Sequence, residues 1–179
     1  VLGILVDDAI VEGYLGGHPI LRMETVDATD AEVIVAVGDA TIRKRIHDSH
    51  VATGRPMAVV IHPTASVSPS VQMGGGIFVG ANAVVNAEAE VGDGVIINSR
   101  AIVEHHCEVG PFSHIAPGAT LGGISKVGEL TLVGIGASVL PDVKIGSNCV
   151  VGAGSVVRED VENGQTVVGS PARPLPPET

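Results

Sequence analysis

Aromatic residues are nearly absent from this chain of 179 residues: phenylalanine, tyrosine and tryptophan together make up 2% of it, and tryptophan does not occur. Hydrophobic residues nevertheless account for 45% of the sequence. A core without aromatic bulk must be built from valine, isoleucine, leucine and alanine in narrow, regular layers. The 24 glycines indicate many tight turns. The length allows one domain, or a small domain joined to a repeat array.

Basic residues and long apolar runs are also scarce. The formal net charge is −10, so the chain has no basic field to displace phosphate counterions, which excludes nucleic acid as a partner. No apolar run approaches the roughly 18 residues that a membrane-spanning helix needs, so we expect no membrane partner. The two cysteines, Cys107 and Cys149, fit free thiols in a reducing compartment. No signal peptide is visible, and we expect a cytoplasmic location.

The N-terminal part of the chain alternates short aliphatic runs with polar stretches. Residues 2–8, 31–39 and 57–61 are predicted to form parallel strands, and residues 40–53 a helix with apolar residues at Ile42, Ile46 and Val51. This order predicts a small Rossmann-like α/β domain over residues 1–60, with ligands near the carboxyl ends of its strands.

From Ile61 the period becomes six. Every sixth residue from Ile61 to Val157 is aliphatic, and a small or β-branched residue follows four positions later. Such regularity is typical of a repeat architecture. The pattern aliphatic-Gly-x-x-small-x resembles the hexapeptide-repeat acyltransferases. The resemblance implies a left-handed parallel β-helix over residues 61–162, with three hexapeptides in each triangular turn, and a homotrimer with active sites at subunit interfaces.

Residues that are three hexapeptides apart then stack in three outward columns. One column is charged, with predicted pairs Glu108–Lys126 and Lys144–Glu162, and a second mixes small and aliphatic residues. The third is apolar: Phe78, Ile96, His114, Leu132 and Val150. An apolar column that faces outward is expected to be buried against another subunit. His114 is the only polar residue in it, either a histidine accommodated at the interface or a ligand-binding group.

The candidate catalytic residues lie in the segment "IVEHHCEVGPFSH" (102–114). It resembles the motif of bacterial nucleotide-amino-sugar N-acetyltransferases and the related sialic acid O-acetyltransferases. By that resemblance His105 is the general base, a role that suits the pKa of histidine, and His114 lies near the thioester of acetyl-CoA, the cosubstrate. His106 stands where the family often has an acidic residue that orients the base, so Glu104 or another residue is expected to replace that function.

The end of the chain also resembles the family. "VGSPARP" (168–174) is similar to a C-terminal segment that lies beside coenzyme A, which places residues 163–179 near the cofactor, although an ordinary exposed tail is the alternative. Basic residues would meet the phosphates, and small residues would let the pantetheine arm approach the backbone. The resemblance implies these cofactor-binding residues: His114, Gly134, Ala137, Lys144, Gly152, Ala153, Arg158, Pro171 and Arg173.

The N-terminal part resembles the family's nucleotide-sugar domain. "GILVDD" matches a strand that ends in paired aspartates, and "AVGDATIRKR" matches a Gly-Asn/Asp-x-x-x-Arg stretch. The resemblance implies that Asp7, Asp8, Gly38, Asp39 and Arg43 bind the substrate. The family's usual first strand and glycine-rich loop are not found upstream of Val1, so we expect both to be missing here.

The favoured interpretation is acetyl-CoA-dependent N-acetylation of a nucleotide-linked amino-sugar, of the UDP-4-amino-sugar type, in bacterial surface-glycan synthesis. The alternative is O-acetylation of sialic acid or another sugar. A zinc-dependent carbonic anhydrase and a non-catalytic β-helix scaffold are less favoured. Adjacent His105 and His106 at a turn tend to diverge rather than converge on one ion, so no metal is expected.

Overall fold

The computed structural model describes residues 4–6, 14–15, 18–22 and 31–175. The chain divides into two compact units, Val1–Ala31 and Glu32–Thr179. In the first unit, β1 (Ile4–Val6) pairs in parallel with β3 (His18–Arg22), and β2 (Tyr14–Leu15) pairs with β3 in the antiparallel sense. The strand predicted at residues 2–8 is thus present at β1, whereas β2 and β3 were not predicted. The boundary between the units falls at residue 31 rather than at residue 60.

The strand predicted at residues 31–39 is wrong. Only Val33 makes an isolated parallel bridge, with Met57. The expected partner segment at residues 57–61 instead contributes strand β4 (Val60–Ile61) to the repeat region, where the Val60 N–H donates to the carbonyl of Ile77 at 2.8 Å. The segment 31–39 therefore contributes this one bridge rather than a strand.

Helix α1 (Ala40–Ala52) is confirmed, but a different side of it is buried. Asp39 caps its N-terminus by accepting a hydrogen bond from the N–H of Ile42 at 2.8 Å. The buried side chains are Arg43, His47 and His50, whereas Ile42 and Val51 are 43% and 51% exposed. The apolar residues Ile42 and Val51 therefore contribute little to the packing of the helix, and Ile46 is half-buried. The helix packs through polar side chains, of which Arg43 donates to backbone carbonyls.

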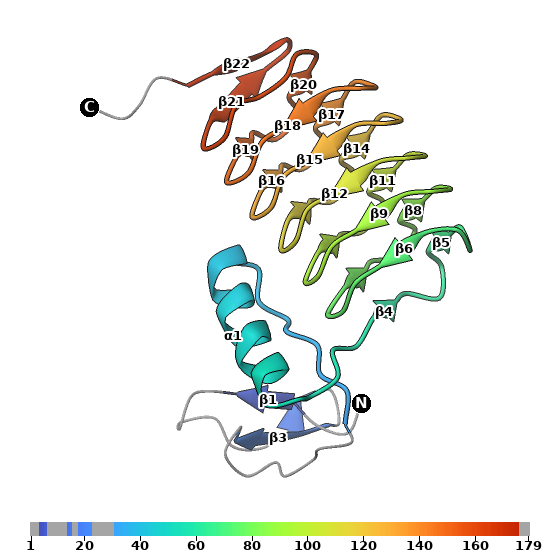
Figure 1. The fold of residues 1–179 in the computed structure, drawn as a ribbon, viewed down its shortest axis with the longest axis vertical. Coiled ribbons are helices and arrows are strands. Elements are labelled where there is room, and N and C mark those ends of the chain that lie inside the picture. The colour runs from blue at the N-terminus through green and yellow to red at the C-terminus, as the bar shows by residue number, and fades with distance from the viewer. Residues whose placement is uncertain (1–3, 7–13, 16–17, 23–30, 176–179) are drawn as a thin grey trace. The chain divides into compact units, whose positions relative to one another are not determined.

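The rest of the second unit is a parallel β-helix of about six turns, built from short strands that recur every six residues (Figure 1). Face 1 consists of β4, β7 (Phe78–Val79), β10 (Ile96–Ile97), β13 (His114–Ile115), β16 (Leu132–Val133), β19 (Val150–Val151), β21 (Thr166–Gly169) and β22 (Ala172–Pro174). Face 2 consists of β5 (Ser66–Val67), β8 (Val84–Val85), β11 (Ile102–Val103), β14 (Thr120–Leu121), β17 (Ser138–Val139) and β20 (Val156–Val157). Face 3 consists of β6 (Gln72–Met73), β9 (Glu90–Val91), β12 (Glu108–Val109), β15 (Lys126–Val127) and β18 (Lys144–Ile145).

The predicted register of three hexapeptides per turn is confirmed over most of the β-helix. Ile97 pairs with Ile115, and Val109 pairs with Val127. The second residue of each strand points inward, and from Val79 to Val157 all these aliphatic residues are buried. Ile61, in the first turn, remains 43% exposed. Each fully buried valine, leucine or isoleucine stabilises the fold by about 1.5–3 kcal/mol.

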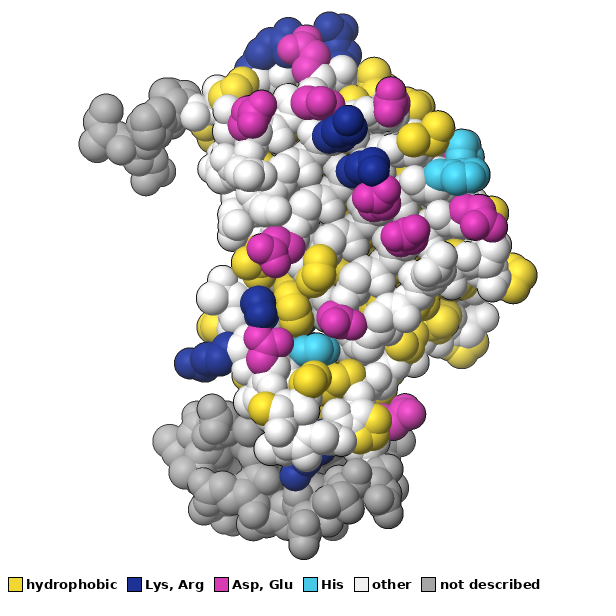
Figure 2. Space-filling view, in the orientation of Figure 1, with side chains coloured by type: hydrophobic (Ala, Val, Ile, Leu, Met, Phe, Trp, Pro, Cys, Tyr) yellow, Lys and Arg dark blue, Asp and Glu magenta, His cyan; other side chains and the backbone are white. Residues whose placement is uncertain are grey.

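The charged column lies on face 3, which Figure 2 shows with basic side chains beside acidic ones. Lys126 donates to Glu108 at 2.5 Å, as predicted. The second predicted pair is wrong, because the repeat is shortened after β20. Val161 bridges Ile145, and Thr166 pairs with Val150, so the last turn contains fewer residues than the turns before it. Glu162 consequently does not stack on Lys144.

The C-terminal segment closes the last turn. Strand β21 continues face 1, and β22 folds back on it in the antiparallel sense. Cys107 and Cys149 are both buried free thiols, as expected. Within the described ranges, no helix combines the length and the apolar character needed to cross a bilayer.

Candidate active site

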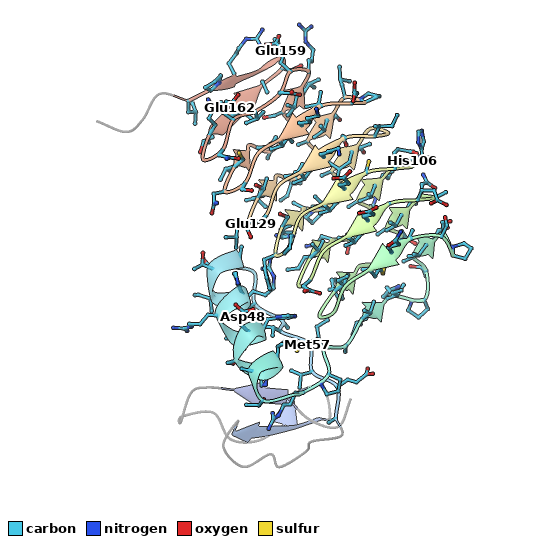
Figure 3. The ribbon with its side chains drawn as sticks, viewed as in Figure 1. Asp48, Met57, His106, Glu129, Glu159 and Glu162 are labelled. Atoms are coloured by element: carbon cyan, nitrogen blue, oxygen red, sulfur yellow. The ribbon has the colours of Figure 1, made fainter. Side chains whose placement is uncertain are left out.

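The two adjacent histidines lie at the corner between faces 2 and 3, immediately after β11. Both side chains are exposed, and Figure 3 shows His106 projecting from this corner away from the β-helix. His106 adopts a left-handed backbone conformation with φ of 57°. Its Nδ1 lies 3.1 Å from Nδ1 of His105, with the ring planes at 86° and the centroids 5.2 Å apart. The sharp corner therefore turns the two rings toward each other instead of letting them diverge.

Glu104 is directed elsewhere. Its Oε2 accepts a hydrogen bond from Nδ2 of Asn86, one turn earlier, at 2.9 Å. The side chain is half-buried. The expectation that Glu104 replaces the family's acidic partner of the base thus finds no contact in support, whereas His106 is in hydrogen-bond contact with His105.

Two residues of the following turn complete the surroundings of His105, and neither was predicted. A β-carbon on Gly123 would lie 2.7 Å from Nε2 of His105, so the imidazole occupies the space above this glycine. The N–H of Ile124 donates to the carbonyl of His105 at 2.9 Å. Ile124 is 50% exposed and has a φ of 67°, which is a strained conformation for a β-branched residue. Both residues stack beside His105 in the next turn of the repeat, and this register is the signal that could have revealed them.

His114 lies on face 1, on strand β13, with a half-buried side chain. Burial lowers the pKa of His114, and the positive charge of Arg43 lowers it further. Its Nε2 lies 3.1 Å from Nδ2 of Asn98, whose Oδ1 accepts from the Ser99 N–H at 2.7 Å. That second contact fixes the Asn98 amide, so Nδ2 donates to Nε2 and the proton of neutral His114 resides on Nδ1. This Nδ1–H is a donor suited to a carbonyl oxygen.

Within one chain, His105 and His114 are not brought together. His105 lies where face 2 meets face 3, whereas His114 contacts Asn98 where face 1 meets face 2. The width of face 2 separates the two corners, and no direct contact joins the two rings.

The residues predicted to bind substrate fall into two groups. Asp7 and Asp8 lie outside the described residues. Gly38, Asp39 and Arg43 are adjacent, but they engage one another and the β-helix. The guanidinium of Arg43 is only 1% exposed and donates to the carbonyls of Val37 (2.9 Å), Gly38 (2.8 Å) and Gly94 (2.8 Å), and to that of Phe112. Burial lowers its pKa, which nearby Asp39 partly counteracts.

The residues predicted to bind coenzyme A are spread over the β-helix. Gly134, Gly152 and Ala153 lie at the corner between faces 1 and 2, whereas Ala137 is a fully buried core residue. Lys144 is exposed on face 3, and Arg158 is exposed after β20. Pro171 follows a cis peptide bond, and Arg173 on β22 lies 3.7 Å from Glu159. One chain does not gather these residues into one pocket.

A shallow groove runs along face 3, lined by the charged column and its glycines, and it contains neither His105 nor His114. In residues 31–175, where side chains are described, no three His, Cys, Asp or Glu side chains are grouped to hold a metal ion. The histidine pair therefore lies on an open corner of the isolated chain.

Comparison with protein families matches the bacterial transferase hexapeptide repeat (six repeats) at residues 88–123 and 124–159. A search of the curated proteins gave no match. Among solved structures, the acetyltransferase domain of PglB from Neisseria gonorrhoeae with acetyl coenzyme A is 39% identical, with a TM-score of 0.90 over 94% of this chain and 84% of that one. PerB from Caulobacter crescentus, in complex with CoA and GDP-perosamine, is 38% identical, with a TM-score of 0.81 over 82% of this chain and 70% of that one.

WeeI from Acinetobacter baumannii has the same fold at 24% identity, with a TM-score of 0.86 over 97% of this chain and 85% of that one. The repeat, the β-helix and the match to its family define a hexapeptide-repeat transferase. More closely, the chain belongs to the nucleotide-amino-sugar N-acetyltransferase family of which PglB and PerB are relatives. The resemblance expected from "IVEHHCEVGPFSH" is thus confirmed.

Proposed function

We propose that this protein transfers the acetyl group of acetyl-CoA to the amino group of a nucleotide-linked amino-sugar, with His105 as general base. The observation that carries the proposal is the exposed His105 ring, held over Gly123 at a corner of the β-helix. Two relatives that are 39% and 38% identical support the substrates, since one binds acetyl coenzyme A and the other binds CoA with GDP-perosamine. We also propose a cytoplasmic location, which two reduced, buried cysteines favour.

The reaction requires that a neutral amine attack the thioester carbonyl. As the C–N bond forms, an N–H proton passes to Nε2 of His105, because its Nδ1 is occupied by His106. The C–S bond then breaks, and the departing thiolate takes this proton from Nε2, so no proton is gained or lost overall. The oxyanion formed at the carbonyl needs a donor, and Nδ1–H of His114 or a backbone N–H of the glycine-rich turns supplies it.

If His105 and His114 act in the same active site, they must come from different chains. Because face 2 separates His105 from His114 within a chain, we propose that His114 reaches the site from a neighbouring subunit of a homotrimer. The apolar column of face 1 supports this assembly, since it leaves Phe78, Leu132 and Val150 37%, 37% and 38% exposed. A three-fold assembly buries such a strip and places a site at each of its interfaces.

The remaining expected roles follow from this arrangement. We propose that Asp7, Asp8, Gly38 and Asp39 contact the sugar nucleotide, and that Arg43 holds the loop with Gly38 and Asp39 in place. For coenzyme A we propose Gly134, Gly152 and Ala153 beside the pantetheine arm. Lys144, Arg158 and Arg173 are the exposed basic residues that we propose for its phosphates.

The test measures CoA thiol release from acetyl-CoA in the presence of UDP- and GDP-linked amino-sugars, each compared with free sialic acid. We expect turnover with an amino-sugar nucleotide and none with sialic acid. His105→Ala should lower turnover by about 10²–10⁴-fold, whereas His62→Ala, at an exposed histidine in the first turn, should not change it. Full activity of His105→Ala would remove His105 from the mechanism, and turnover with sialic acid alone would overturn N-acetylation.

A further inference from the structure

His105 and His106 form a pair that shares one proton. Both contacting atoms are Nδ1, at 3.1 Å, so one ring must donate and the other must accept. The opposite side of the His105 ring, with Nε2, packs over Gly123, where a β-carbon would lie 2.7 Å from Nε2. Nδ1 of His105 is thereby taken by His106, and Nε2 is the ring nitrogen that remains for a substrate.

From this geometry we infer that His106 is a positioning residue that keeps His105 in the tautomer in which Nε2 is free to accept a proton. The inference rests on the proposed function of His105 as base. For Nε2 to carry the lone pair, Nδ1 must carry the proton, and that proton needs an acceptor. Nδ1 of neutral His106 is that acceptor. His106 is then protonated on Nε2, which points away from His105.

No carboxylate takes this role among the side chains described at this corner. Glu104 accepts from Asn86 at 2.9 Å. Glu88 and Asp142 lie one turn before and two turns after His106 at the same corner, but neither has a contact with the His105 ring. The ring of His106 is therefore the side chain at this corner that can accept a hydrogen bond from Nδ1–H of His105.

The pair of His105 and His106 returns to its starting protonation state at the end of each catalytic cycle. When Nε2 of His105 takes the proton of the attacking amine, the ring becomes an imidazolium, and its Nδ1–H continues to donate to His106. This hydrogen bond is stronger from the charged ring than from the neutral one, which favours proton transfer. A proton already on Nδ1 of His106 would leave two N–H groups facing each other, or would force His105 into the tautomer with Nε2 protonated. Protonation of either ring thus inactivates the pair.

The corner tolerates other side chains at the position of His106. The positions one turn before and one turn after, Glu88 and Ile124, have left-handed backbones with φ of 59° and 67°. A glutamine at position 106 offers a neutral acceptor oxygen, and a phenylalanine offers only a ring of similar size. His106→Gln and His106→Phe are therefore a matched pair that differs in hydrogen bonding.

The test that needs no activity is ¹⁵N NMR of the histidine rings at alkaline pH. We expect the proton of His105 on Nδ1 in the wild type and in His106→Gln. In His106→Phe it should move to Nε2, the tautomer that free imidazole side chains favour. A wild-type His105 with its proton on Nε2 would overturn the inference.

The kinetic test follows on the same variants. His106→Phe should lower kcat by about 10–100-fold with little change of either KM, which is less than the full effect of losing a general base. His106→Gln should recover most of the rate. His106→Glu should move the acidic limb of the pH–rate profile to higher pH, because a carboxylate stabilises the imidazolium.

An unchanged kcat in His106→Phe, or an unmoved pH profile in His106→Glu, would contradict the positioning role. If the wild type has the expected tautomer but acetylates no amino-sugar, the pairing stands and the proposed function falls. The two failures are thus distinguishable.

Discussion

The imidazole of His105 and the α-carbon of Gly123 occupy successive turns of the β-helix so closely that a β-carbon on Gly123 would lie 2.7 Å from Nε2. Gly123 therefore sets the position of the proposed base. Gly123→Ala should displace the ring and lower kcat on the order of tenfold or more, with a melting temperature close to that of the wild type.

A double-mutant cycle separates this effect from a general disturbance. In the His105→Ala background, the same Gly123→Ala substitution should cost no further activity, because no ring remains to be displaced. An additive loss in the double variant would show that Gly123 acts through something other than His105.

The proposed division of the site between subunits predicts that two inactive variants complement each other. His105→Ala and His114→Ala should each lower turnover or raise the KM for acetyl-CoA. When the two variants are assembled into mixed trimers, roughly a quarter of the sites regain both histidines if each site combines two chains. The measurement is the activity after co-expression, compared with each variant alone. If mixing restores nothing, the proposal that His105 and His114 of different subunits share one site is wrong.

The hydrogen bonds of Arg43 predict that replacing this residue will unfold α1 locally. Arg43→Met removes donors from the carbonyls of Val37, Gly38, Gly94 and Phe112, and leaves buried acceptors unpaired at about 1–3 kcal/mol. Amide exchange in residues 40–52 should become faster, while the core of the β-helix keeps its protection. Arg45→Met, at an exposed position of the same helix, is the control. Equal protection in both variants would exclude this role of Arg43.

Two histidines with lowered pKa make stability depend on pH. Burial lowers the pKa of His50, with Arg55 and His47 contributing, and burial and Arg43 lower that of His114; both ordinarily titrate at 6.5. The unfolded chain then binds more protons than the folded one below that pH. The free energy of unfolding should be fully retained above pH 6.5 and should decline as the pH falls toward the lowered values.

This loss of stability should be measurable as a lower midpoint of urea unfolding at pH 5.5 than at pH 8. His50→Gln, which keeps a polar side chain without titration, should reduce this fall. A variant that falls as steeply as the wild type would assign the pH dependence to other groups.

Ile124 has a strained backbone and a side chain that is only half-buried. Its φ of 67° is unfavourable for a β-branched residue, and half of the side chain is exposed. Ile124→Gly should therefore leave the free energy of unfolding unchanged or raise it by about 0.5–1 kcal/mol. A loss of more than about 1 kcal/mol in chemical denaturation would show that the side chain packs more than its exposure suggests.

The repeat region could be predicted because it obeys one local rule. A residue that recurs every six positions specifies which side chains point inward, and the turn of three hexapeptides then sets the columns, so Glu108–Lys126 and the isolation of His114 in an apolar column followed from counting. The rule fails where the chain departs from it: after Val157 the repeat is shortened, and Glu162 no longer stacks on Lys144. The histidine motif identified the family because its residues and their spacing match the motif of that family.

The side-chain contacts of α1 and of the histidine corner could be determined only from the tertiary structure. The sequence predicted a helix with apolar residues, but its buried Arg43 donates to the backbone carbonyls of Gly94 and Phe112, which are distant in the chain. Every residue has such a carbonyl, so the sequence does not indicate which of them a side chain will contact. Likewise, the sequence left the partner of His105 open between Glu104 and other residues. The left-handed backbone of His106 turned its ring onto His105, while Asn86 in the preceding turn engaged Glu104. Periodicity determines which face a residue lies on, and side-chain direction at a corner determines what it touches.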